Sequence, residues 1–233
     1  MALYAISDLH LALSGDKPMD VFGDRWLKHD ENIKKNWLDI IKEEDTVLIA
    51  GDISWSINIE EGMADLNWIH ELPGQKILIR GNHDYWWNSI TKLNKLYSDM
   101  HFIQNNHFTY KDYAICGTRG WICPFSDAFS EKDEKIYNRE LIRLRLSLDT
   151  ARAKGFEKFI VMLHYPPTND KFQDSGFVDI LREFKVEKVI YGHLHGSFQS
   201  KVSDDSSDGI EYLLTSCDFL NFYPLLINTN KKK

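Results

Sequence analysis

Five short apolar runs of the sequence each end directly in a polar block, and this repetition limits the folds open to the chain. The runs have continuous apolar residues, which is typical of strands buried on both faces. Helical spacing between the first runs, as in Ile33, Trp37 and Ile40, indicates strand–helix–strand units and a largely parallel sheet with right-handed crossovers. The five runs are ALYAI (2–6), TVLIA (46–50), KILIR (76–80), KFIVML (158–163) and KVIY (188–191).

The middle and the end of the chain predict further strands and helices. Short strands within 101–117 are expected to form a hairpin or a second sheet, and a long helix is expected from near Ser130 to near Gly155. A helix near 177–185 and a final strand pair at 210–216 and 223–228 follow, with an exposed turn at 202–209. No internal repeat or low-complexity linker divides the sequence, so we expect a single domain over residues 1–233.

Composition excludes several classes of protein. The formal charge of −7 argues against a general affinity for nucleic acid or an anionic membrane. Nothing approaches the roughly 20 consecutive apolar residues of a membrane span, and the start MALYAISDLH leaves no room for a signal peptide. Cys116, Cys123 and Cys217 form no CxxC pair, and an odd number cannot all pair internally, so we expect a reducing, cytoplasmic location. The oligomeric state is left open.

The polar blocks supply side chains that bind metal ions. In chain order they are D-L-H (8–10), G-D (51–52), G-N-H-D (81–84), the single His164 and G-H-L-H (192–195). The carboxyl ends of parallel strands share one edge of a sheet, so these five segments are expected to converge there. Their imidazole, carboxylate and amide donors suit Mn²⁺, Fe or Zn²⁺ better than Mg²⁺ or Ca²⁺. The donors are too many for one ion, and two adjacent sites with one shared carboxylate would use them.

These five blocks, in this order and each after a predicted strand, resemble the calcineurin-like metallophosphoesterases, and among them the bacterial phosphodiesterases. The resemblance runs from Asp8 to His195. It implies an α/β fold, a four-layer αββα sandwich of two mixed β-sheets flanked by helices, with a dinuclear metal site. Carried over motif by motif, it implies that Asp8, His10 and His195 hold one ion, that Asn82, His164 and His193 hold the other, and that Asp52 bridges them.

The same resemblance gives the two remaining residues of the 81–84 block catalytic roles. It implies that His83 faces the substrate and either protonates the leaving oxygen or stabilises the developing charge, for which an imidazole is suited because its pKa lies near neutrality. It implies that Asp84 orients His83 or raises its pKa. The expected activity is hydrolysis of a small-molecule phosphate ester by a hydroxide bridging two metal ions, with a phosphodiester favoured. The alternatives are a phosphomonoesterase and a non-catalytic interaction module with the same fold.

The residues after Asp52 differ from those of two other branches of the family, which argues against the activities of those branches. The segment ISWS (53–56) follows Asp52 where Ser/Thr protein phosphatases have VDRG, which argues against protein phosphatase activity. Trp55 stands where purple acid phosphatases have a tyrosine ligand, so their chromophore is not expected.

The remaining polar and aromatic candidates admit two interpretations each. Arg119 either binds a substrate phosphate or is the solvated arginine of a plain turn. For the aromatic residues near the blocks, packing is favoured over stacking on a flat substrate group. These are Trp55, Tyr85, Trp86, Trp87, Trp121 and Tyr165. Residues outside the blocks are expected at the surface, namely His29, His70, His101 and His107, together with the helical Arg139, Arg143, Arg145 and Arg152.

Overall fold

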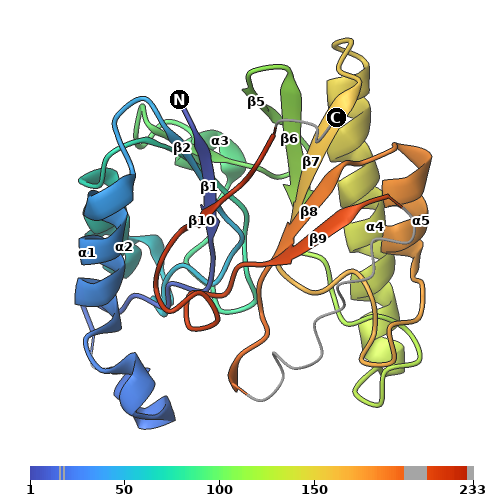
Figure 1. The fold of residues 1–233 in the computed structure, drawn as a ribbon. Coiled ribbons are helices and arrows are strands. Elements are labelled where there is room, and N and C mark those ends of the chain that lie inside the picture. The colour runs from blue at the N-terminus through green and yellow to red at the C-terminus, as the bar shows by residue number, and fades with distance from the viewer. Residues whose placement is uncertain (16, 18, 197–208, 230–233) are drawn as a thin grey trace.

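Two five-stranded sheets lie face to face, and helices cover the outer face of each sheet, as Figure 1 shows. The computed structural model describes residues 1–15, 17, 19–196 and 209–229, so most of the turn expected at 202–209 lies outside it. Each sheet is mixed, with four parallel strands and one antiparallel edge strand. This is the four-layer α/β sandwich predicted from the sequence.

The first sheet contains the early strands of the chain. Its strand order is β10 (Leu225–Leu226), β1 (Leu3–Ile6), β2 (Thr46–Ile49), β3 (Gln75–Leu78) and β4 (Met100–Phe102). Helices α1 (His29–Ile40), α2 (Ile59–His70) and the short α3 (Ile90–Leu93) belong to this half, with two 3₁₀ turns at Met19–Phe22 and Asp24–Trp26. Asn58 caps α2, and its side chain accepts a hydrogen bond from Glu61 N, which is half of the predicted capping box.

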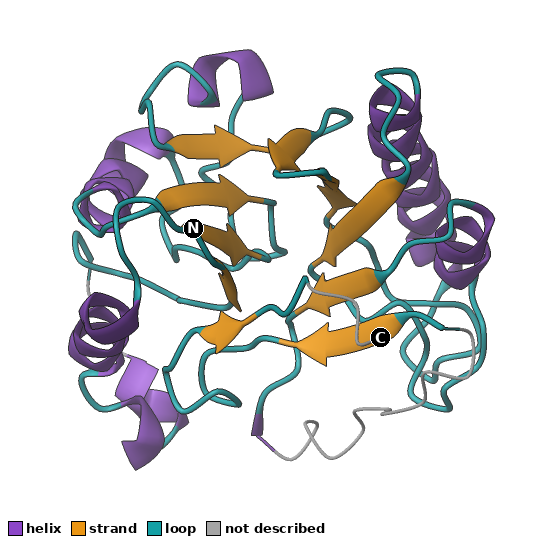
Figure 2. Cartoon of the chain, turned by 45° about the horizontal axis from the view of Figure 1, so that its top comes forward, coloured by secondary structure: helices purple, strands orange, loops and turns teal. Residues whose placement is uncertain are grey.

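The second sheet has the order β5 (Phe108–Tyr110), β6 (Tyr113–Thr118), β7 (Lys158–Leu163), β8 (Lys188–Tyr191) and β9 (Glu211–Leu214). Helices α4 (Glu131–Arg152) and α5 (Gly176–Glu183) cover it. The long helix begins where the sequence predicted, because Ser130 and Asp133 form a complete capping box. Figure 2 shows the two sheets between their outer layers of helices.

Two strand pairings differ from the sequence-based expectation. The hairpin expected within 101–117 does form, because β5 and β6 pair and begin the second sheet, but β4 joins the first sheet parallel to β3. The last two strands do not pair with each other, since β9 adds to β8 and β10 adds to β1. Apolar periodicity identifies a strand but carries no information about its partner, which explains both errors.

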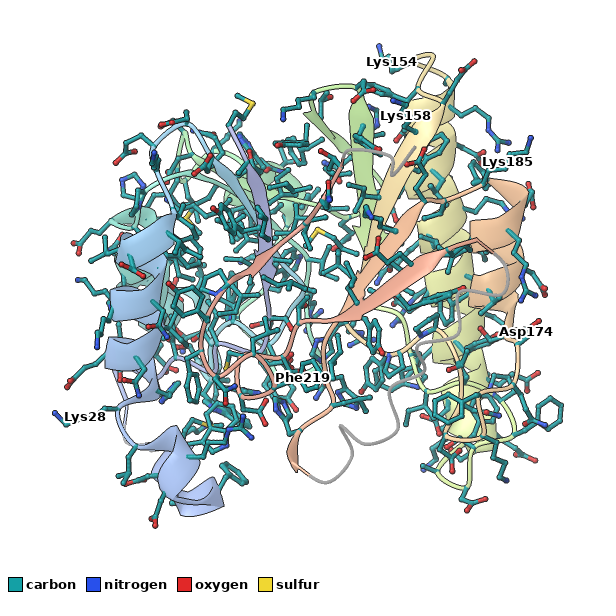
Figure 3. All side chains as sticks on the ribbon, viewed as in Figure 1. Lys28, Lys154, Lys158, Asp174, Lys185 and Phe219 are labelled. Atoms are coloured by element: carbon teal, nitrogen blue, oxygen red, sulfur yellow. The ribbon has the colours of Figure 1, made fainter. Side chains whose placement is uncertain are left out.

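The carboxyl ends of the parallel strands meet at one end of the sandwich. Lys158, which begins β7, lies near the top of Figure 3, whereas Phe219, which follows β9, lies between the two halves in the lower half of the view. Residues just beyond β1 and β9 pair across the sheets, with Ser7 opposite Ser216. Between the sheets, an apolar layer that includes Leu48, Ile77 and Met162 fills the interior up to this end. No helix in the described part of the chain is long and apolar enough to cross a membrane.

Candidate metal centre

The loops after β1, β2, β3, β7 and β8 bring the predicted ligands together at this end of the sandwich. The candidate ligands form two groups, within each of which one donor atom per residue lies within 4.8 Å of the others. The amide of Asn82 joins the second group, because its Oδ1 lies 2.8 Å from His164 Nε2. The first group is Asp8, His10 and His195, and the second is Asp52, His164 and His193.

Asp52 stands between the two groups. Its Oδ2 lies 3.3 Å from His164 Nε2 and 3.8 Å from His10 Nε2, so one oxygen faces a histidine of each group. Its Oδ1 accepts a hydrogen bond of 2.8 Å from His83 N, which fixes the carboxylate in that orientation. These contacts place the Asp52 carboxylate between the two groups of candidate ligands.

Asp8 is completely buried and firmly held. Its Oδ2 accepts a hydrogen bond of 2.6 Å from Ser7 Oγ, and His193 N lies 3.1 Å from both of its oxygens. Burial by itself would raise the pKa of the Asp8 and Asp52 carboxyls, but the surrounding imidazoles and hydrogen bonds lower it well below its usual range. Both groups are therefore carboxylates, the form that binds metal ions.

The four histidines divide into two kinds. Burial opposes protonation of His164 and His195, yet the neighbouring carboxylates outweigh it and raise the pKa of these imidazoles to about 9 and about 10. Burial prevails at His10 and His193, and it lowers their pKa to about 4 and about 3. The two carboxylates thus favour the protonated, positively charged form of His164 and His195.

Two carboxylates, an amide and four imidazoles are donors that fit a pair of divalent transition-metal ions. The Nε2 atoms of His10 and His195 face each other at 3.4 Å, as expected of two rings that share a cation.

Hydrogen bonds and aromatic contacts hold each imidazole ring. His195 Nδ1 lies 2.8 Å from Asp218 Oδ1, and His164 Nδ1 lies 3.0 Å from the carbonyl oxygen of Ala50. In both rings Nε2 is left for the ion. His10 stacks on Trp55 at a centroid distance of 4.9 Å, while His10 Nδ1 is buried and has no hydrogen-bond partner among the described residues.

Asp218, which contacts the candidate ligand His195, was missed by the sequence reasoning. It is buried and follows β9, so the rule that picked out polar residues after strands would have selected it. It was overlooked because it belongs to none of the five motif blocks. Tyr165, one of the aromatic residues singled out from the sequence, also lies beside a candidate ligand, since its ring is 4.0 Å from the ring of His193.

The backbone of the centre is strained. Asp8, His10, Asp52 and His193 have φ values between 47° and 72°, the left-handed region, which costs about 1–2 kcal/mol for a residue with a side chain. Backbone hydrogen bonds such as His10 N to Asp52 O, at 3.0 Å, hold this conformation. Gly81 is required for a different reason, because a Cβ atom there would overlap the Asp52 carboxylate.

His83 and Asp84 have different surroundings. The His83 ring lies 4.3 Å from the ring of Trp55, and its Nε2 lies 4.0 Å from Asp52 Oδ2. Its side chain is 35% exposed, so it can meet a substrate, and burial of the remainder lowers its pKa. The Asp84 carboxylate is buried and accepts hydrogen bonds from the backbone N–H groups of residues 53, 54 and 81 and from Trp86 Nε1. These contacts differ from the expected one, because they fix the loop and do not orient the His83 ring.

For residues outside the ligand set, the structure agrees with some of the sequence-based predictions and differs from others. Trp86 and Trp87 pack in the core, as predicted, whereas Trp55 lies against His10 and His83. His29 is not a surface residue, because it is buried with Nε2 3.1 Å from the carbonyl oxygen of Leu9. The Arg119 side chain is only 13% exposed, which argues against the solvated turn.

The fold and the clustered ligands define an α/β-sandwich protein with a metal-binding centre at its strand ends. The sequence profile of the calcineurin-like phosphoesterases matches residues 1–197, and the chain belongs to this family. The profile covers all seven candidate ligands.

Relatives of the chain include two phage proteins and one bacterial protein. The Gene 66 protein of Mycobacterium phage D29 is 36% identical over 167 residues, which cover 72% of this chain and 66% of that protein. The Gene 66 protein of Mycobacterium phage L5 is 38% identical over 78 residues, or 34% of this chain and 37% of that protein. A probable cyclic nucleotide phosphodiesterase of Vesicomyosocius okutanii is 25% identical over 67% of this chain and 65% of its own length. The chain thus spans about one third to two thirds of these relatives.

Solved structures share the fold at low sequence identity. The protein TT1561 of Thermus thermophilus superimposes with a TM-score of 0.57 at 12% identity, covering 98% of each chain. A phosphopantetheinyl hydrolase of Mycobacterium tuberculosis gives a TM-score of 0.55 at 12% identity, covering 100% of this chain and 97% of that chain. A protein of unknown function from Aquifex aeolicus gives 0.52 at 18% identity, with 97% and 95% covered.

Proposed function

We propose that this member of the family is a phosphodiesterase that depends on two divalent metal ions and acts on a small-molecule ester. The observation that carries the proposal is the position of Asp52, whose Oδ2 faces His10 of one ligand group and His164 of the other. The name of the probable cyclic nucleotide phosphodiesterase supports a diester over a monoester. A phosphomonoesterase on a small phosphorylated molecule is the alternative.

Each ligand group would hold one ion. Bound together, two ions of Mn, Fe or Zn would supply Lewis-acid activation of the phosphate and of the attacking water. Two divalent ions would carry four positive charges, whereas Asp8 and Asp52 supply two negative ones. The pocket would therefore attract an anion although the chain is acidic. In this proposal Asp8, His10 and His195 hold one ion, Asn82, His164 and His193 hold the other, and Asp52 is shared.

The chain's own residues then position and protonate the substrate. His83 is the partly exposed imidazole beside Asp52, and we assign it the transfer of a proton to the leaving oxygen. Asp84 acts through the loop that it fixes, since Gly81 N and Ser54 N donate hydrogen bonds to its carboxylate. A cytoplasmic location and a single domain over residues 1–233 remain predictions.

The test is metal analysis combined with a pair of chromogenic substrates. Protein purified without chelator and supplied with Mn²⁺ is expected to bind about two ions per chain. It is expected to hydrolyse bis(p-nitrophenyl) phosphate with a higher kcat/KM than p-nitrophenyl phosphate. A preference for the monoester would favour the alternative, and two bound ions without turnover of either ester would favour a non-catalytic module.

A further inference from the structure

Four arginines gather beside the metal centre around one buried carboxylate. Arg80 and Arg119 follow β3 and β6, next to loops that carry ligands, whereas Arg139 and Arg143 come from α4. The carboxylate is that of Glu140, which is completely buried. We call Arg80, Arg119, Arg139 and Arg143 the arginine cluster.

One carboxylate does not neutralise this cluster. Arg143 Nη1 and Arg139 Nε donate to Glu140 Oε1 at 2.9 Å and 3.3 Å, and Thr118 Oγ1 donates to the other oxygen at 2.5 Å. Arg80 donates instead to the Asp84 carbonyl oxygen at 3.0 Å. Even when the buried Asp84 carboxylate is counted with Glu140, positive charge remains in excess. The two helical arginines therefore do more than form the solvated face predicted from the sequence.

Arg119 has hydrogen-bonding capacity that the described residues do not fill. Its side chain is 13% exposed, its Nε is buried with no acceptor in the part of the chain that the structure describes, and its Nη2 lies 3.8 Å from Glu140 Oε1. Trp121 covers one face of the guanidinium, with Cζ 4.4 Å from the ring centroid. Shielding such a group from water without acceptors is costly, and its planar fork of N–H donors matches a phosphate.

A short chain of contacts connects the cluster to the metal ligands. Both His164 N and Tyr165 N donate to the Arg119 carbonyl oxygen at 3.0 Å. The Tyr165 ring lies 4.0 Å from the ring of His193 and 5.1 Å from that of Trp121, the residue that supports Arg119. One aromatic side chain thus separates the cluster from a candidate ligand.

We propose that the arginine cluster is a second anion subsite, and that the substrate is a phosphate ester carrying a second phosphate group apart from the scissile one. The inference rests on the proposed phosphoesterase function. The ester bound at the metal centre would place its other phosphate on Arg119, with Arg80 and Arg143 completing the positive field. The interposed Tyr165 ring favours two phosphates separated by an organic group, such as a sugar, over directly joined phosphates.

A matched pair of substrates tests this subsite. Thymidine 5′-(p-nitrophenyl phosphate) and its 3′-phosphorylated form differ only in the second phosphate. The wild-type enzyme with Mn²⁺ is expected to prefer the 3′-phosphorylated form about tenfold or more in kcat/KM, the value of a charge-assisted hydrogen-bonded pair. In Arg119→Met the preference is expected to fall to near unity. Arg145→Met is the control, since Arg145 lies on α4 outside the cluster and pairs with Glu183, and it should keep the preference.

A binding measurement separates this inference from the proposed function. Isothermal titration with adenosine 3′,5′-bisphosphate and adenosine 5′-monophosphate should show tighter binding of the bisphosphate to the wild type, and no such difference in Arg119→Met. Turnover of both thymidine esters at equal kcat/KM would overturn the subsite and leave the phosphoesterase intact. Absence of any turnover would overturn the function, and equal binding of the two nucleotides would overturn the subsite independently. Circular dichroism confirms that each variant is folded.

Discussion

The two ligand groups of the metal centre are built from similar residues but are supported differently. In the group of Asp8, His10 and His195, the His195 side chain is 31% exposed and its ring is held by the carboxylate of Asp218. In the other group, His164 is completely buried and its ring is held by the carbonyl oxygen of Ala50, at the end of β2. One group therefore depends on the side-chain carboxylate of the buried Asp218, and the other on the backbone of the core.

This difference implies unequal tolerance to mutation. A backbone carbonyl that follows a central strand cannot be removed by a side-chain substitution, whereas the support from Asp218 can. We therefore expect the His164 group to keep its ion under conditions in which the His195 group loses its own. Asp52 contacts histidines of both groups, so substitution of Asp52 should weaken metal binding in both groups alike.

The largest effect is expected for Asp52→Asn. Loss of the shared carboxylate oxygen should weaken both sites together and lower kcat/KM about 10³-fold, since about 4 kcal/mol of transition-state stabilisation corresponds to that factor. Metal analysis after dialysis and steady-state kinetics would measure the two effects. Loss of only one ion from this variant would contradict the shared role.

His83→Ala should separate chemistry from metal binding. Turnover is expected to fall about 10²–10⁴-fold, the usual contribution of a general acid, while both ions remain bound because His83 belongs to neither group. His70→Ala is the matched control, because His70 is an exposed histidine paired with Asp99 on the outside of the fold. A His83→Ala protein depleted of metal would show that His83 is a ligand.

Asp218→Asn should affect the two groups unequally. We expect the metal affinity of the His195 group to fall about 10–100-fold, the usual cost of losing a carboxylate behind a ligating histidine. The metal affinity of the His164 group should not change. Titration of the metal-free protein with Mn²⁺ would show one weakened step and one normal step. Equal weakening of both steps would contradict the inference that only the His195 group depends on Asp218.

The pH dependence of metal binding gives the smallest and most specific signal. Each group has one histidine of raised pKa, about 10 for His195 and about 9 for His164, so both bear protons at neutral pH when no ion is bound. A metal ion must displace these protons, so metal affinity should fall as pH falls below 9, and binding at pH 7 should release about two protons. Titration calorimetry in buffers of different ionisation enthalpy measures this number. In Asp218→Asn the number should be lower than in the wild type, because one of the two carboxylates that raise the His195 pKa is gone and only Asp8 remains.

Local signals in the sequence predicted the buried strands and the convergence of their polar ends, whereas the four-layer sandwich and the set of seven ligands were implied by the resemblance to the family. Continuous apolar runs identify buried strands, and a polar residue at a strand end needs no further information to be placed at the edge of a sheet. Asp8, Asp52 and His164 follow this rule, and the structure brings them together.

What the sequence did not reveal depends on contacts between distant segments. The partner of β10 could not be read from its own residues, nor could the hydrogen bonds that draw Asp84 away from His83. Arg143 was expected on a solvated face because helical periodicity does not show that Glu140, on the same helix, is buried. Such residues are chosen by tertiary packing, which a motif does not record.

The left-handed backbone at Asp8, His10, Asp52 and His193 has an evolutionary consequence. Glycine would relieve this conformation at each position, so a related chain that does not need these side chains would gain stability by losing them. Keeping all four side chains has a cost in stability, which is expected if the proposed metal binding requires them.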